Sequence, residues 1–147
     1  MYARILVAID GSSTSDRALQ EAIALAKDQK AELRLVHVVD RAPLAPDYIE
    51  LVDESEIDKI FTEAGQKVVA DGLAQTKAAG ITATSTLLQT VAERVANVII
   101  DEAKHWPADL IIVGTHGRHG IGHFFLGSVA EGVSRNAAMP VLLIRSQ

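Results

Sequence analysis

Short apolar runs bounded by turn residues alternate along the chain with segments whose apolar residues recur every three or four positions. The short runs predict strands that are covered on both faces, and the three-to-four spacing predicts helices that pack through one face. Strands are predicted at 5–9, 31–39, 81–87, 110–113 and 141–144, with helical apolar faces at 18–26, 57–73, 91–99 and 127–137. This βαβαβαβαβ order predicts a doubly wound α/β fold, in which a parallel sheet carries helices on both faces.

Turn and cap residues predict where these elements begin and end. Three pairs have the spacing of a capping box and predict helix starts: Ser13 with Asp16, Thr90 with Glu93, and Ser128 with Glu131. Gly80 predicts the end of the second helix. The strand at 81–87 alternates apolar residues with threonines, which favours a place at the sheet edge. The segment from Asp40 to Glu56 holds two prolines and several acids, so it predicts a long connection and a candidate lid or partner surface.

Composition narrows the class of protein. With 147 residues, 48% of them hydrophobic, residues 1–147 are expected to fold as one domain. The absence of cysteine excludes disulfides and thiolate chemistry. A net charge of -5 without a basic run argues against nucleic-acid binding. No apolar run reaches the length of a membrane span or a signal sequence, so we expect no membrane association and a cytoplasmic location.

Glycine is concentrated in one loop. Six of the ten glycines lie between Gly114 and Gly132, after the strand at 110–113 and around the start of the last helix. Glycine allows positive φ and close approach of the backbone, and the free N–H groups at a helix start attract anions. The pattern therefore predicts a phosphate-binding loop. It is neither a Walker A loop, since no Gly-Lys-Ser/Thr occurs, nor a Rossmann fingerprint, since Phe125 stands where the third glycine should be.

Five segments carry a resemblance to a known family: 4–12 (RILVAIDGS), 36–38 (VHV), 108–118 (ADLIIVGTHGR), 126–131 (LGSVAE) and 140–142 (PVL). Over nearly its whole length the chain resembles the universal stress protein family. ATP-binding members of that family carry Gly, two residues, Gly, nine residues and Gly-Ser/Thr, and this chain has that spacing at Gly114, Gly117 and Gly127-Ser128. The resemblance implies the ATP-binding subgroup and a Rossmann-like sheet in the order 3-2-1-4-5.

The resemblance also implies roles for particular residues. Asp10 should face ribose or a phosphate-bound Mg²⁺, and the backbone of Val38 should meet the adenine of ATP or another adenine nucleotide. The remaining implied binding residues are Gly114, Gly117 and Arg118 at ribose and phosphate, and Gly127, Ser128 and Val129 at the phosphates. Physical reasoning agrees, because ligands of open α/β sheets bind beyond the carboxyl ends of the strands where the winding reverses.

The implied function is regulation in the stress response, in which nucleotide orders the loop from Gly114 to Gly127 and so changes the choice of an unidentified protein partner. The resemblance also implies a homodimer through the apolar edge strand Val141 to Ile144. Two alternatives remain open. One is a slow Mg-dependent ATPase or phosphotransferase centred on Asp10, and the other is a nucleotide-free scaffold that binds protein through Phe124 and Phe125.

No catalytic residues are assigned, because the sequence supports no Ser-His-Asp or paired-carboxylate arrangement. The loop histidines His116, His119 and His123 have no helical spacing and no cysteine nearby, which favours a cation bound through phosphates over a protein-held metal. His37 and Trp106 are interpreted as packing residues.

Overall fold

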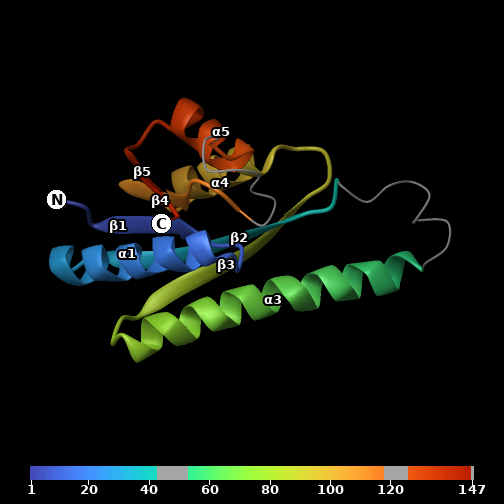
Figure 1. Ribbon diagram of the computed structural model, residues 1–147, viewed down its shortest axis with the longest axis horizontal. Helices are drawn as coiled ribbons and strands as arrows, with labels where there is room; N and C mark the ends of the chain where they lie inside the picture. The colour runs from blue at the N-terminus through green and yellow to red at the C-terminus, as the bar shows by residue number, and fades with distance from the viewer. Residues whose placement is uncertain (43–52, 118–125, 147) are drawn as a thin grey trace.

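The computed structural model describes residues 1–42, 53–117 and 126–146, and it contains a five-stranded parallel sheet (Figure 1). The elements in chain order are β1 (Arg4–Ala8), α1 (Ser13–Gln29), β2 (Glu32–Asp40), α3 (Glu54–Ala78), β3 (Ala83–Thr90), α4 (Val95–His105), β4 (Leu110–Gly114), α5 (Ser128–Asn136) and β5 (Val141–Ile144). The strand order is β3-β2-β1-β4-β5, which confirms the predicted fold class and the edge place of the third strand.

Helices cover both faces of the sheet. Helices α1 and α3 lie on one face, and α4 and α5 lie on the other (Figure 1). Successive residues of β1 point to opposite faces, so Ile5 and Val7 join the core under α1 and α3 while Leu6 joins the core under α4 and α5. All three are 0% exposed. This double coverage explains why the central strands appear in the sequence as unbroken apolar runs.

Helix α3 lies against β2 and β3 through two glycines about two turns apart. A Cβ on Gly72 would lie 2.7 Å from Leu35 Cδ2, and a Cβ on Gly65 would lie 2.8 Å from Leu87 Cδ1. Only glycine permits this approach, at a cost of roughly 0.5–1 kcal/mol each relative to alanine in a helix. The predicted apolar face of this helix is partly wrong, because Ile57 and Val68 are buried while Ile60 is 64% exposed.

Two of the predicted capping boxes are replaced by other contacts. Ser12, rather than Ser13, caps α1, and its hydroxyl accepts the Ser15 N–H at 3.2 Å. Thr90 ends β3, and its hydroxyl donates to the Glu93 carbonyl at 2.7 Å and accepts the Glu93 N–H at 3.0 Å. This pair makes a turn ahead of α4, which begins only at Val95, so Val91 is 64% exposed and does not belong to the helix.

The third predicted capping box and the predicted connection also differ. Gly127 is the N-cap of α5 and no side chain caps this helix, because Ser128 already has helical backbone. The connection predicted from Asp40 to Glu56 is shorter, since Asp40 belongs to β2 and Asp53 caps α3 by accepting the Ser55 N–H at 3.1 Å. Residues 43–52 lie outside the described ranges, so the lid interpretation stays a prediction.

The two predicted packing residues do pack. His37 is buried, and its Nδ1 donates to the Ile9 carbonyl at 2.7 Å. Trp106 is partly buried against the core under α4 and α5. Within the ranges that the structure describes, no helix combines the length and apolarity that a bilayer crossing requires.

Candidate functional site at the carboxyl edge of the sheet

The winding of the sheet reverses between β1 and β4, which are neighbours although they are far apart in the sequence. Val7 pairs with Ile112, β2 and β3 lie on the far side of β1, and β5 lies on the far side of β4. Such a reversal leaves a crevice beyond the carboxyl ends of the two central strands. Asp10 follows β1 and Gly114 ends β4, so both predicted site residues lie at this crevice.

The carboxylate of Asp10 is oriented by the start of α1. The Asp10 N–H donates to Ser15 Oγ at 2.9 Å, and Asp10 Oδ1 accepts the Ser12 N–H at 2.9 Å. Gly11 has a φ of 77°, which makes the tight turn between them. The other oxygen, Oδ2, lies so near the glycine segment that a Cβ on Gly117 would be 2.5 Å from it. The structure therefore brings Asp10 and Gly117 together.

The other two glycines of the spacing motif are held against protein backbone. A Cβ on Gly114 would lie 2.9 Å from Thr14 Cγ2 and 3.3 Å from the Thr14 carbonyl oxygen. The Gly127 N–H donates to Thr115 O at 2.7 Å, and a Cβ there would lie 2.8 Å from the same oxygen. The expectation of positive φ in this loop is wrong for the described motif glycines, because the described glycines with positive φ are Gly11 and Gly80. Glycine is required at Gly114, Gly117 and Gly127 because a Cβ at each position would come within 3.0 Å of a neighbouring atom.

Helix α5 begins beside this crevice, and its first N–H groups have no hydrogen-bond partner among residues 1–42, 53–117 and 126–146. Its first backbone hydrogen bond runs from the Glu131 N–H to Gly127 O at 2.9 Å, and its start has no side-chain cap. The N–H groups of Ser128 and Val129 precede that bond and lie in the first turn, where the helix dipole is positive. Ser128 is exposed and Val129 is half-buried. This arrangement can bind an anion.

Val38 lies where β2 continues past the end of β1. Ala8 pairs with Val36, and β2 runs on to Asp40. The Ile9 N–H donates to Val36 O at 2.8 Å, so the Val36 carbonyl points toward β1. Because backbone groups two residues apart on a strand point the same way, the N–H and C=O of Val38 also face the side of β1. There they can serve as one donor and one acceptor for a ligand.

A part-exposed apolar surface lies next to these backbone groups. Ala8, Val38, Leu88 and Val129 are half-buried against the core under α4 and α5, so their side chains lie on the same face of the sheet. A planar apolar group could lie against them while its edge meets the Val38 backbone. Sequence reasoning assigned no role to Ala8 or Leu88.

Thr115 is a further residue that sequence reasoning missed. It is 4% exposed; its N–H donates to Ile144 O at 2.8 Å and its carbonyl accepts the Gly127 N–H. It thereby holds β4, β5 and the start of α5 together. Thr14 and Ser15, which contact Gly114 and Asp10, were also missed. The available signal was the placing of hydroxyl residues directly after a central strand.

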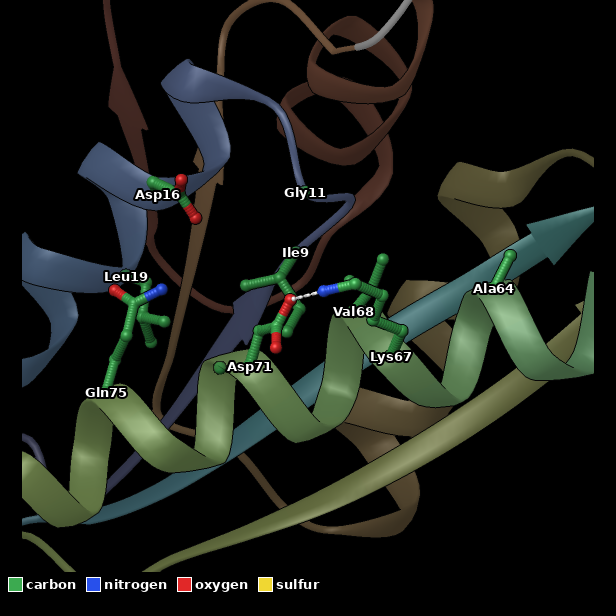
Figure 2. Close-up of a pocket in the computed structure, with 10 residues that line it drawn as sticks. Ile9, Gly11, Asp16, Leu19, Ala64, Lys67, Val68, Asp71 and Gln75 are labelled. Carbon is green, nitrogen blue, oxygen red and sulfur yellow. Dashed lines mark hydrogen bonds and ion pairs between the residues drawn. The ribbon is translucent and has the colours of Figure 1, made fainter.

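Arg118, and with it His119, His123, Phe124 and Phe125, lies outside the described residues. Nδ1 of His116 lies 3.0 Å from Thr115 Oγ1. In residues 1–42, 53–117 and 126–146 no group of three or more histidine, cysteine, aspartate or glutamate side chains could hold a metal. A cavity of about 330 Å³ lies between α1 and α3, and its lining includes Ile9 and Gly11 on either side of Asp10 (Figure 2).

Comparisons with known proteins agree with this architecture. The sequence model of the universal stress protein family matches residues 1–145. Universal stress protein YxiE of Bacillus subtilis is 35% identical over 151 residues, which cover 99% of this chain and 100% of that protein. The crystal structure of a universal stress protein family member from Burkholderia pseudomallei has a TM-score of 0.77 and 36% identity, covering 99% of this chain and 97% of that one.

A universal stress protein from Archaeoglobus fulgidus, solved in complex with dAMP, has a TM-score of 0.70 and covers 97% of this chain and 98% of its own. At 22% identity this likeness concerns the fold alone. The family model spans nearly all residues and the relatives align along almost their full lengths. The chain therefore belongs to the universal stress protein family.

Proposed function

We propose that this chain, as one universal stress protein domain over residues 1–147, binds ATP with Mg²⁺ in the crevice and acts as a nucleotide-dependent regulator. The observation that carries the proposal is the convergence of the Asp10 carboxylate, Gly117 and the uncapped start of α5. The N–H groups of Gly127, Ser128 and Val129 come from the segment at that helix start. In the proposal Ser128 and Val129 donate to the phosphates, and the Ser128 hydroxyl adds a third donor.

The adenine and ribose of the nucleotide are proposed to lie near Val38 and Asp10, beside the phosphate site at the start of α5. The Val38 N–H and C=O offer the donor and acceptor that the edge of adenine requires, with Ala8 and Val129 available as apolar contacts. Asp10 Oδ2, beside Gly117, is placed to accept from ribose hydroxyls. Gly114 and, by family resemblance, Arg118 complete the ribose and phosphate contacts.

Magnesium enters this proposal with the nucleotide. When bound, Mg²⁺ would neutralise charge on the phosphates, and its preference for few protein carboxylates and many other oxygen ligands suits a site that offers Asp10. Oδ1 of Asp10 accepts the Ser12 N–H, and Oδ2 lies beside Gly117 on the side of the proposed phosphates.

Support from relatives is of two kinds. The dAMP complex belongs to a protein with this fold, which makes an adenine nucleotide the first ligand to test. The intact spacing from Gly114 through Gly117 to Gly127-Ser128 is the pattern of the family's ATP-binding members. In the proposal, bound nucleotide changes the surface around Gly117 and the start of α5, and a partner protein binds this changed surface with a different affinity.

Denaturing the purified protein and chromatographing the released small molecules tests the proposal directly, together with calorimetric titration by Mg-ATP. We expect adenine nucleotide in the released fraction and saturable heat in the titration of nucleotide-free protein. An empty fraction and no heat at saturating Mg-ATP would overturn the proposal. Phosphate release faster than in a Gly127→Val control would instead favour the ATPase alternative.

The homodimer is proposed on strand β5. This strand lies at a sheet edge, and Leu142 is 39% exposed, so the edge offers unpaired backbone and apolar side chains to a second copy. Leu142→Lys should shift the protein from dimer to monomer in sedimentation velocity. Ile60→Lys, at a 64% exposed position on α3, is the matched control that should leave the dimer intact. A monomeric parent protein, or a dimeric Leu142→Lys variant, would contradict the assignment.

A further inference from the structure

The cavity between α1 and α3 lies on the face of the sheet opposite the Val38 and Val129 side chains, although Ile9 and Gly11 of its lining flank Asp10. It is lined by the end of β1, the first turns of α1 and the middle of α3, and its volume is about 330 Å³ (Figure 2). Its lining residues Ile9, Leu19 and Val68 belong to the core under α1 and α3. Val38 and Val129 of the crevice pack on the opposite face of the sheet. A ligand in the cavity would therefore leave the crevice open.

The floor of the cavity is apolar and closely packed. Ile9, Leu19 and Val68 are 5%, 1% and 9% exposed, and Gly72 brings the α3 backbone against the sheet. Pockets that bind small molecules begin at roughly 300 Å³ and combine apolar walls with a few polar groups. This cavity has the size for a ligand with one ring.

The rim of the cavity carries one unbalanced negative charge. Lys67 Nζ lies 2.7 Å from Asp71 Oδ2, so these two lining charges pair with each other (Figure 2). Asp16 lines the same cavity from the first turn of α1, and no partner for its carboxylate is found among the described residues. In Figure 2 this carboxylate points toward the space between the two helices.

A neutral polar group completes the rim. Gln75 Oε1 accepts from Gln20 Nε2 at 2.7 Å, so the carboxamide of Gln75 is oriented and its NH₂ group faces the other way. The cavity thus offers an apolar floor, one carboxylate and one amide.

We infer that this cavity binds a small organic cation, with an apolar or aromatic body between α1 and α3 against the exposed Ala64 and the edge of Val68, and a protonated amine at Asp16. Charge complementarity selects the amine over a carboxylate, since an anionic ligand would face Asp16 with only a paired lysine to attract it. Binding on this side of the sheet needs no nucleotide.

The test uses 2-phenylethylamine as the probe and phenylacetate as its anionic counterpart, in amide NMR titrations of the nucleotide-free protein. We expect 2-phenylethylamine to shift the Gly11 and Gly72 amides, with a dissociation constant on the order of 1 mM for a ligand of this size. Phenylacetate should bind at least several-fold more weakly. Equal binding of the two probes, or no shift at these amides, would overturn the inference.

Two variants separate the cavity from the surface around it. Ala64 lines the cavity and is exposed, so Ala64→Phe should fill the space and abolish probe binding, while Ala70→Phe, at an exposed α3 position outside the lining, should not. Asp16→Asn should weaken the amine about two- to fivefold, the range of an exposed ion pair. Unchanged binding by Ala64→Phe would refute the site. Unchanged probe binding in Ser128→Pro, in which Mg-ATP binding is expected to weaken, would confirm that the two sites are independent.

Discussion

Helices α1 and α5 begin beyond the carboxyl ends of the two central strands, β1 and β4, and the N–H groups of their first turns are satisfied differently. The start of α1 is satisfied by the chain itself, since Ser12 caps it and Asp10 and Ser15 exchange hydrogen bonds with its turn. The start of α5 has only Gly127 at the N-cap and no side-chain cap. An orphan N–H group left by the chain is available to a ligand. The contrast favours α5, rather than α1, as the anion-binding helix of the proposed site.

The largest expected effect comes from Gly127→Val, which removes the close contact that sets the start of α5. A Cβ at this position would lie 2.8 Å from Thr115 O, so the backbone must shift. We expect loss of Mg-ATP binding by calorimetry and a fall in the free energy of unfolding of about 1–3 kcal/mol.

Gly80→Ala is the control for that loss of stability. Gly80 has a φ of +75° and open space around its Cα, so alanine there costs roughly 1–2 kcal/mol through backbone strain alone. It should bind Mg-ATP like the parent protein. If both variants lose nucleotide binding equally, general destabilisation explains the result and the contact with Thr115 does not.

Ser128→Pro sharpens the comparison because it deletes one N–H group without disturbing the helix. Gly127 has φ -61° and ψ 151°, a conformation that a residue before proline favours, and proline suits the first position of a helix. Loss of a hydrogen bond to a charged phosphate should weaken Mg-ATP binding by about 1.5–3 kcal/mol at unchanged unfolding free energy. Calorimetry and chemical denaturation measure the two quantities.

Two matched variants accompany that test. Glu54→Pro makes the same substitution at the first position of α3, where Asp53 has φ -58° and ψ 126°, and should leave nucleotide affinity unchanged. Ser128→Ala removes only the hydroxyl, so its effect should be the smaller one. Parent-like affinity in Ser128→Pro would place the phosphates elsewhere.

The smallest expected effect is that of Ser12→Ala at the capped helix. Loss of the Ser12 hydroxyl, which accepts the Ser15 N–H, should lower the free energy of unfolding by about 1 kcal/mol. Nucleotide affinity should stay near the parent value, because Asp10 is held by the backbone N–H of Ser12. A strong loss of affinity without loss of stability would show that α1 also serves the ligand.

The sequence predicted the sheet well because its central strands are buried on both faces. An unbroken apolar run such as Leu110 to Val113 is typical of a central strand. Because such runs alternate with amphipathic helices, few arrangements of the strands in a sheet are possible. Helix starts were predicted less well. Ser12 and Ser13 are equally good caps by residue type, and the choice depends on where the backbone turns after Gly11.

The sequence predicted which residues of the candidate site lie near one another, but not the physical reason for its glycines. Asp10, Gly114, Gly117 and Gly127 lie at one crevice, yet the three motif glycines serve close contact rather than positive φ. The position of Thr115 directly after β4 could have marked it, but its role could not be predicted, because that role depends on the Ile144 carbonyl of the neighbouring strand. Gly65 and Gly72 look like helix breakers in the sequence, and only their packing explains them.

The hydrogen bond from Thr115 to Ile144 also bears on biosynthesis. β1 pairs with β4, more than a hundred residues later in the chain, and Thr115 is fastened only when β5 is in place. Contacts of such sequence separation form late in folding, because a long loop must close first. A nascent chain on the ribosome therefore has no assembled crevice until β5 has emerged, and the proposed ligand could be bound only after synthesis of that strand.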